Sequence, residues 1–394
     1  MIVVLAALLA ARAAPAGEAA VATGLLGDPG GLRARAAAAG LDLQGSMTLD
    51  VLDDARGGLH RGVSPIYTLD LIGELDTARA GWWEHGRFHV YLLGTAGDSL
   101  NKRTGDMQFA SNIEGGSTFT VLEAWYEHDF LDDRLSWLVG LHDLNADFYM
   151  PQYGQLFVNS SLGLGIDMSQ VGISTFPATS FGTRLAFAPT VTTYVMAGLY
   201  DGVPGDPAHP YGTQVVFGTG DGLFAIGEAG MYSADDAPYY KLAIGGWYHT
   251  RRFDDYTGRT RNENSGLYGL AERELWRDAE SGRSVGSFVQ IGTAEGDRNQ
   301  TGIYLGAGLN VTGLLPARPS DVFGVGIAQA RNSGRFLDAN PALRGAETAL
   351  EFTYQLAPTS WLTLQPDLQY IIDPSTDPAT DDAVVVGMRF LITL

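Results

Sequence analysis

The chain repeats one pattern, a segment of about ten residues in which apolar and polar side chains alternate. In one of the clearest examples, Leu350, Phe352 and Tyr354 alternate with Glu351, Thr353 and Gln355. Alternation with a period of two is typical of a β-strand that has one apolar face and one polar face. A tilted strand of about ten residues is long enough to cross the hydrocarbon layer of a membrane.

About sixteen segments of this kind can be counted. Five precede residue 143 and cover 41–51, 67–76, 88–92, 118–127 and 134–142. No later run reaches the roughly 18 apolar residues that a membrane helix needs, and a closed barrel is the other fold that pairs its backbone groups inside a membrane. We therefore predict an all-β fold, a transmembrane antiparallel β-barrel of about 16 strands. The other eleven segments begin near Thr183, Val191, Gly222, Tyr239, Gly266, Val285, Ile303, Asp321, Thr348, Trp361 and Ala383.

The connections between these segments largely alternate between short and long. Outer-membrane barrels have short periplasmic turns and long external loops, so this alternation agrees with a barrel. The final segment, 384–394, has its apolar side chains on one parity and is expected to close the barrel against the first strand. The short links lie at 131–133, 188–189, 233–238, 278–283 and 357–359, and the long ones at 53–65, 96–116, 143–181, 201–217, 250–265 and 332–345.

The longest of these connections, residues 143–181, has no clean strand or helix period. Loops of this length are uncommon in compact domains and are usually functional. A barrel that conducts a solute needs a constriction. We predict that residues 143–181 fold inward and form a constriction loop in the lumen.

The first sixteen residues have the pattern of a secretory signal peptide. A short apolar run from Ile2 to Ala11 is followed by the small residues Ala14-Pro15-Ala16. A short buried helix is the alternative interpretation. We predict a signal peptide over 1–16, a short N-terminal periplasmic segment over 17–40 and the barrel over 41–394. The protein is then expected in the cell outer membrane.

The composition excludes several functional classes. The formal net charge of −20 disfavours nucleic acid as a partner. There is no cysteine, so neither a disulfide framework nor a thiolate metal site is available. The seven histidines show no two-histidine helical spacing, and no nucleophile elbow or phosphate-binding glycine loop is present. We therefore predict no metal, no cofactor and no enzymatic activity.

Several segments resemble those of a known family. They are Gly27-Asp28-Pro29-Gly30-Gly31-Leu32-Arg33, Leu122-Glu123-Ala124-Trp125-Tyr126-Glu127, Val139-Gly140-Leu141-His142-Asp143, Phe157-Val158-Asn159-Ser160-Ser161 and residues 361–372. Together they resemble the carbohydrate-selective outer-membrane porins of Gram-negative bacteria, the OprB type. The resemblance implies a sixteen-stranded barrel that admits glucose and similar small sugars by facilitated diffusion. It also implies contact with membrane lipid and assembly as a homo-oligomer.

A channel for neutral sugars needs weak hydrogen-bonding contacts beside aromatic surfaces, because a solute must leave as well as enter. Arg184 points inward if Leu185 and Phe187 face lipid, and we expect Arg184 and Arg134 to face acidic residues across the pore. The candidate substrate or pore-lining residues are Glu123, Trp125, Glu127, Arg134, His142, Asp143, Asn145, Asp147, Phe148, Tyr149, Asn159, Arg184, Asp367, Gln369 and Arg389.

Structural roles are the alternatives for several of these candidates. Glu123 and Glu127 can attach the loop to the wall by accepting hydrogen bonds from its backbone amides, and Trp125 can be a packing residue. Asp367, Gln369 and Arg389 can belong to a generic water-lined surface. Two other functions stay open as well. One is a general or ion-selective porin on the same scaffold, and the other is a barrel enzyme that acts on lipid.

Overall fold

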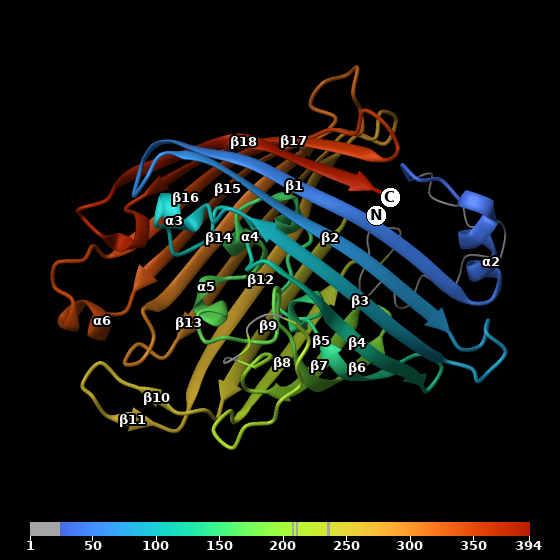
Figure 1. Cartoon of the computed structure of the whole chain (residues 1–394), viewed down its shortest axis with the longest axis horizontal. Coiled ribbons are helices and arrows are strands. Elements are labelled where there is room, and N and C mark those ends of the chain that lie inside the picture. Colours follow the sequence, from blue (N-terminus) through green and yellow to red (C-terminus); the bar gives the residue numbers. More distant parts are fainter. Residues whose placement is uncertain (1–23, 207–208, 210–211, 235–236) are drawn as a thin grey trace.

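The computed structural model is a closed barrel of sixteen antiparallel strands, which confirms the predicted fold class (Figure 1). It describes residues 24–206, 209, 212–234 and 237–394. Neighbours in the barrel are neighbours in the sequence, except for the closing pair β1–β18 and for β9, which pairs directly with β12. The barrel strands are β1 (Leu41–Gly58), β2 (Gly62–Asp76), β3 (Gly86–Gly97), β4 (Thr118–Phe130), β5 (Leu135–His142), β6 (Ser180–Thr190), β7 (Thr193–Asp201), β8 (Leu223–Tyr232), β9 (Tyr240–His249), β12 (Asn264–Arg277), β13 (Ser284–Ala294), β14 (Thr301–Thr312), β15 (Val322–Asn332), β16 (Ala346–Gln355), β17 (Leu362–Ile372) and β18 (Asp381–Thr393).

The last strand closes the barrel against the first. β18 pairs antiparallel with β1, so that Leu49 lies opposite Phe390 and Asp50 lies opposite Arg389. The other edge of β1 pairs with β2. Because both edges of every barrel strand are paired, the sheet has no open edge that another strand could join. The predicted role of the final segment is therefore confirmed.

The two ends of the barrel differ in the length of their connections. The turns 131–134, 191–192 and 278–283 lie at one end, whereas the long connections 98–117, 143–179 and 202–222 lie at the other. By the topology of outer-membrane barrels, the end with the long connections is external.

One connection is much shorter than predicted. The sequence pattern indicated a loop over 53–65, but β1 continues to Gly58 and β2 begins at Gly62. The alternation of β1 breaks at this point because the register against β18 shifts between Asp54 and Arg56. Such a bulge adds an unpaired residue to one strand without ending the ladder.

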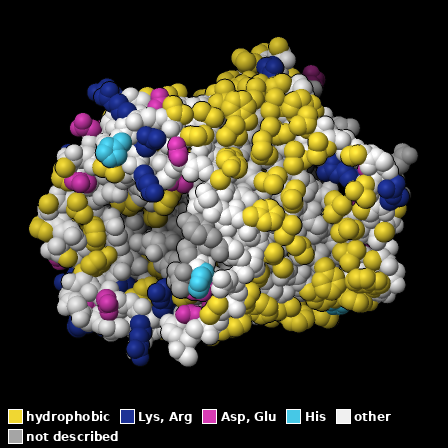
Figure 2. Space-filling view, in the orientation of Figure 1, with side chains coloured by type: hydrophobic (Ala, Val, Ile, Leu, Met, Phe, Trp, Pro, Cys, Tyr) yellow, Lys and Arg dark blue, Asp and Glu magenta, His cyan; other side chains and the backbone are white. Residues whose placement is uncertain are grey.

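Alternate residues of the strands face opposite sides of the wall. On β6, Leu185 is 50% exposed and Phe187 is 39% exposed, whereas Arg184, directly before Leu185, is 2% exposed. The exposed apolar side chains form a broad band over the outer surface, which is yellow in Figure 2. Arg184 therefore faces the interior, as the alternation predicted.

Helical segments are short and lie either before β1 or in the connections between strands. Among the described residues, no helix is long and apolar enough to cross a membrane. The predicted signal peptide, 1–16, lies outside the described residues. A small hairpin, β10 (Phe253–Asp254) and β11 (Thr260–Arg261), lies in the connection from β9 to β12. The helices are η1 (Pro29–Gly31), α2 (Leu32–Ala38), α3 (Asn101–Thr104), η2 (Leu144–Ala146), η3 (Tyr153–Leu156), α4 (Ser160–Gly163), α5 (Ile166–Ser169), α6 (Gly334–Ala339) and η4 (Pro374–Thr376).

Candidate functional site: the narrowed lumen

The connection between β5 and β6, residues 143–179, lies inside the barrel (Figure 1, around α4 and α5). Glutamates of the wall hold it through its backbone. The N–H of Tyr149 donates to Glu228 of β8 over 2.9 Å, and the N–H of Tyr153 donates to Glu272 of β12 over 2.8 Å. A charged acceptor makes a stronger hydrogen bond than a neutral one, so these contacts fix the path of the loop.

Further along, the same loop reaches the opposite wall. Glu351 of β16 accepts hydrogen bonds from the N–H groups of Val158 at 2.7 Å and Asn159 at 2.9 Å. In the ring of sixteen strands, β16 lies nearly opposite β5, where the loop begins. The loop therefore crosses the bore from one side to the other and narrows it.

A second connection also folds inward, and the sequence analysis did not predict this. Residues 98–117, between β3 and β4, place the N–H groups of Met107 and Gln108 against Glu347 of β16, at 2.8 and 3.2 Å. The N–H of Asn112 donates to the carbonyl of Val158 in the first loop over 2.8 Å. The alternation on β16 does indicate that Glu347 points inward, as Glu351 does. It does not indicate which segment of the chain the Glu347 carboxylate binds.

Arg184 is the centre of a buried ionic cluster. Its Nε donates to Asp147 of the loop at 2.8 Å, and its Nη2 donates to Glu127 of β4 at 2.9 Å. Its Nη1 donates to the Ser136 hydroxyl at 2.8 Å. Arg184 thus contacts acidic residues directly in the wall and the loop, and does not face them across an open pore as expected. Because the whole cluster is buried, it joins the loop to the wall and leaves little of these charges on the lumen surface.

Glu123 also attaches the loop to the wall. It accepts the N–H of Asp143 at 2.9 Å, which is the structural role that the sequence analysis left open. The Asp143 carboxylate accepts the N–H groups of Asn145 at 2.9 Å and Phe176 at 3.2 Å. Burial raises the pKa of Asp143 above its usual range. The Asn145 amide donates to the carbonyl of Phe148, so its side chain also serves the loop.

Four further candidates are packed between the loop and the wall. Phe148, Tyr149 and Asn159 have no exposed surface, and His142 is 2% exposed. The Nδ1 of His142 lies 2.9 Å from the hydroxyl of Tyr200. These side chains were expected to line the pore. They do not face it here, because the loop presses them against the inner wall.

The candidates on β17 and β18 bind the inward loops as well. The Gln369 amide donates to the carbonyl of Ala110 at 2.7 Å and to Asp367 at 2.9 Å. Arg389 pairs with Asp50 at 2.7 Å and donates to the amide oxygen of Asn112 at 2.7 Å. Asp367 and Gln369 are buried, so they are not part of a generic water-lined surface.

Arg134 was expected to face acidic residues across the pore, and this prediction is wrong. Its guanidinium donates to the carbonyls of Ala188 and Pro189, at 3.2 and 2.8 Å, and lies over the ring of Phe187 on the outer face. The reason is its position in the periplasmic turn between β4 and β5, which is remote from the acidic residues of the loop. Arg134 therefore belongs to the turn and not to the pore.

On the inner wall, the indole of Trp125 on β4 stacks against neighbouring side chains of β3. The imidazole of His89 lies parallel to its indole, with ring centroids 4.5 Å apart, and the Arg87 guanidinium is 5.8 Å from its ring centre. Gly140 on β5 makes this position possible. Its φ is +144°, and a Cβ there would lie 2.8 Å from the Cβ of Trp125. The pairing of Trp125 with Gly140 is visible in the ladder of β4 and β5.

The inner face of β2 and β3 is the part of the wall that the loops leave partly open. Asp70, Glu74, Arg87 and Tyr91 there are neither buried nor fully exposed. The Tyr91 hydroxyl donates to Asp70 at 2.6 Å, and Arg87 lies 3.4 Å from Glu74. Parity predicts that these residues point inward, but only the path of the loops shows that this wall stays accessible. The face offers carboxylates, a guanidinium and a phenol beside the Trp125 indole.

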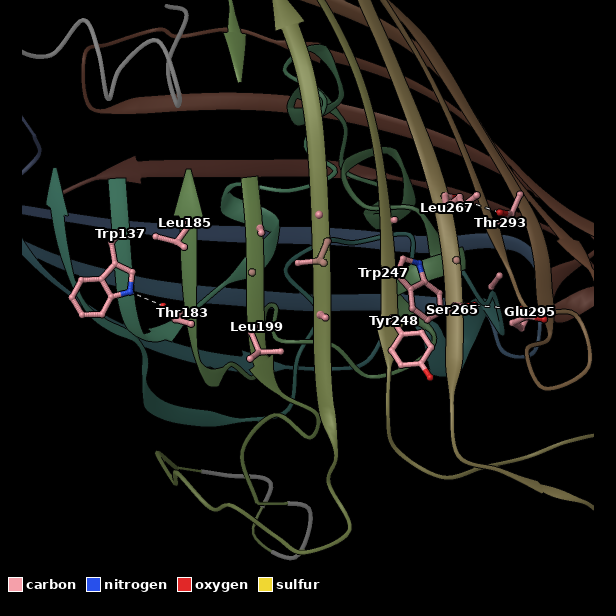
Figure 3. Close-up of a pocket in the computed structure, with 18 of the residues that line it drawn as sticks. Trp137, Thr183, Leu185, Leu199, Trp247, Tyr248, Ser265, Leu267, Thr293 and Glu295 are labelled. Atoms are coloured by element: carbon pink, nitrogen blue, oxygen red, sulfur yellow. Dashed lines mark hydrogen bonds between the residues drawn. The ribbon is translucent and has the colours of Figure 1, made fainter. Parts of the chain in front are cut away.

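A large apolar groove lies on the outside of the barrel. It has a volume of about 1320 Å³ and spans the outer face from β5 to β13 (Figure 3). Trp137, Leu185, Leu199, Tyr248 and Leu267 border it. Its floor consists of small residues on β7, β8 and β9, namely Ala197, Ala225, Gly227 and Gly246. The groove therefore belongs to the membrane-facing surface and not to the lumen.

No group of three or more histidine and acidic side chains in the described part of the chain is arranged to hold a metal ion. The site is instead a bore narrowed by two inward loops and bordered on one side by a polar wall. A sixteen-stranded barrel of this construction has the architecture of a porin.

Comparison with known proteins agrees with this architecture. The family model described as "Carbohydrate-selective porin, OprB family" matches residues 60–394, and the chain belongs to this family. Such barrels lie in the outer membrane. "Porin B" of Pseudomonas aeruginosa is 24% identical over 415 residues, covering 93% of this chain and 90% of that protein. "Putative porin QuiX" of Acinetobacter baylyi is 22% identical, covering 92% of this chain and 91% of that protein.

Solved structures show the same fold. The high-pH structure of Pseudomonas putida OprB superposes with a TM-score of 0.86 at 20% identity, covering 94% of this chain and 98% of that one. The low-pH structure of the same protein gives a TM-score of 0.64 at 18% identity, with the same coverage.

Proposed function

We propose that the protein is a passive outer-membrane channel through which small carbohydrates, glucose-type mono- and oligosaccharides, diffuse down their concentration gradient. The observation that carries the proposal is the accessible inner face of β2 and β3. It presents Asp70, Glu74, Arg87 and Tyr91 beside the indole of Trp125. Sugar hydroxyls hydrogen-bond to such carboxylates and guanidinium groups, and the apolar ring face of a sugar stacks on an indole.

Each of these contacts is individually weak at a wet surface, which suits a channel. A solute held too firmly would not leave on the far side. Family membership supports transport rather than catalysis, since porins are channels. No cofactor is part of this mechanism.

Liposome swelling with a size series of sugars tests the proposal. Trp125→Ala removes the inner indole, and Trp137→Ala is the matched control, since Trp137 faces outward and donates to Thr183 at 2.8 Å. We expect Trp125→Ala to change the relative rates of glucose and maltose and Trp137→Ala to leave them unchanged. Equal rates in both variants and in the wild type would refute a sugar contact at Trp125.

A cation-selective porin is the second candidate, and the charge of the accessible wall favours it. Asp70 and Glu74 there outnumber Arg87. Planar-bilayer recordings separate the two functions. Current that glucose and maltose reduce in a concentration-dependent way indicates a sugar site. A strong cation preference together with current that these sugars leave unchanged indicates an ion channel.

The proposal includes a homo-oligomer and export through a signal peptide at 1–16. The outer groove supports self-association, because its small residues allow another wall to approach closely. A Cβ at Gly227 would lie 3.7 Å from the carbonyl oxygen of Met196, an ordinary van der Waals contact, so the backbone accepts a side chain there and we expect Gly227→Phe to fill part of the groove. We expect this variant to have a lower mass in light scattering, whereas Gly269→Phe on β12 leaves the mass unchanged. N-terminal sequencing of the mature protein tests the cleavage.

A further inference from the structure

A polar cavity of about 510 Å³ lies at the external end of the outer surface, near the seam between β18 and β1. Three arginines from two distant segments line it, together with Tyr370 and Asp382. Two of them, Arg56 and Arg61, come from the hairpin between β1 and β2, and Arg344 comes from the connection between β15 and β16. The cavity is outside the lumen and takes no part in the transport path.

A bulge in β1 directs Arg56 to this outer surface. Asp54 has no exposed surface and pairs with Val385, which faces the interior. After the register shift Arg56 pairs with Val384, which lines the cavity. Tyr370, also paired with Val384, is 39% exposed on the outer face. The bulge therefore places a guanidinium where regular alternation would have given a different side chain.

The guanidinium groups of Arg56 and Arg61 are available to a ligand. Within the described part of the chain, neither one forms a hydrogen bond or a close ion pair, whereas Arg344 pairs with Asp373. The Asp382 carboxylate is already engaged, because it accepts the Tyr370 hydroxyl at 2.6 Å and the Asp373 N–H at 3.1 Å. Three arginines against Asp381 and Asp382 leave the lining with one net positive charge, although the whole chain carries −20.

The surroundings favour a lipid over a soluble anion. Directly toward the membrane from the cavity, β18, β17 and the neighbouring β16 present exposed apolar side chains, among them Val386, Leu368 and Phe352 at 44, 43 and 44% exposure. In Figure 2, Lys and Arg side chains also gather at the loop-bearing end, beyond the apolar band. A lipid with its acyl chains on this band would place its headgroup at the cavity.

We propose that this cavity binds the phosphorylated headgroup of an outer-leaflet glycolipid. Arg56 and Arg61 donate to the phosphate oxygens, since a guanidinium matches phosphate geometry with two parallel hydrogen bonds. Arg344 and the Tyr370–Asp382 pair form the remaining wall and offer partners to the sugar hydroxyls. Such a lipid anchors the β1–β18 seam to the outer leaflet.

The test measures binding of fluorescent lipid A to the purified full-length protein in detergent. The variant is Arg56→Gln/Arg61→Gln. The matched control is Arg251→Gln/Arg252→Gln, which removes the same charge from two exposed arginines in the connection after β9. Lipid A without phosphates and inorganic phosphate are the comparison probes. Arg61→Gln alone serves if the double variant does not fold, because Arg61 lies in the link between the two strands.

We expect the double variant to bind phosphorylated lipid A about tenfold more weakly or worse, and the control to stay within about twofold of the wild type. Dephosphorylated lipid A should bind weakly to all three proteins. Equal affinity in the variant and the wild type would overturn the site. Displacement of lipid A by inorganic phosphate at an equal concentration would overturn the assignment to a lipid, since the site would then recognise the anion alone.

Discussion

Replacing Arg184 with methionine should detach the start of the inward loop from the wall. Arg184 makes two buried ion pairs, with Asp147 at 2.8 Å and Glu127 at 2.9 Å, and the arginine side chain is 2% exposed. Methionine retains much of the volume but removes the charge. Glu127 keeps Arg87 and the Ser136 hydroxyl, whereas Asp147 loses its guanidinium partner and keeps the His142 imidazole at 3.4 Å.

The expected cost follows from the burial of these charges. Removing one member of a buried ion pair destabilises a structure by about 3–5 kcal/mol, because the remaining charge is left without compensation. At about 1.4 kcal/mol per factor of ten, this changes the equilibrium between an attached and a detached loop by more than about a hundredfold. The cost acts on the attachment of the loop, since the strand ladders of the wall do not involve the guanidinium.

Single-channel conductance in a planar bilayer measures the effect. We expect Arg184→Met to show larger or strongly fluctuating conductance and to pass larger sugars in liposome swelling. Arg134→Met is the matched control, because Arg134 contacts only carbonyls and a ring at the periplasmic turn. Arg184→Met/Asp147→Asn should recover part of the wild-type conductance, since it removes the carboxylate that has lost its guanidinium partner.

If Arg184→Met migrates as a folded barrel on unheated gels and has the conductance and sugar rates of the wild type, the buried cluster does not hold the loop in place. A conductance change of the same size in Arg134→Met would also refute it, because the effect would then not depend on the ion pairs.

Two further predictions concern the loop and its attachment. Glu351→Ala leaves the N–H groups of Val158 and Asn159 without their acceptor, at a cost of about 1–3 kcal/mol for each buried group; we expect faster amide exchange in that part of the loop with unchanged exchange in the strands. Burial raises the pKa of Asp167 in α5 to about 7. The folded state therefore binds this proton more tightly than the unfolded chain, and stability falls by up to about 1.4 kcal/mol per pH unit as the pH rises from about 4 to 7. Thermal unfolding in detergent should show this decrease, and Asp167→Asn should reduce it; an identical pH profile in the variant would contradict the assignment.

The orientation of most wall side chains was predictable, because it depends only on the alternation of residues along one strand. The parity of β6 alone placed Arg184 inside and Leu185 outside, and lipid on one side with water on the other keeps this rule along every strand. The end of β1 was not predictable in the same way, since the bulge after Asp54 breaks the alternation without ending the ladder. A glycine-rich stretch with mixed polarity looks the same whether it forms a loop or a bulged strand.

The site was harder to predict because it depends on contacts between distant segments. The sequence indicated that 143–181 is a functional loop, and Arg184 does pair with Asp147 and Glu127. Whether Phe148 faces the bore or the wall depends on the path of the loop, which glutamates far along the chain determine. The inward fold of 98–117 depends in the same way on Glu347, more than two hundred residues later.

The wall glutamates hold the inner loops by accepting hydrogen bonds from backbone N–H groups, which every residue except proline carries. Where the loop is held only in this manner, as at Val158 and Tyr153, its side chains can change while the contact remains; at Asp147 the attachment still depends on the carboxylate. The same barrel can therefore carry loops of different sequence, so that solute preference can change by substitution in the loop while the wall stays the same.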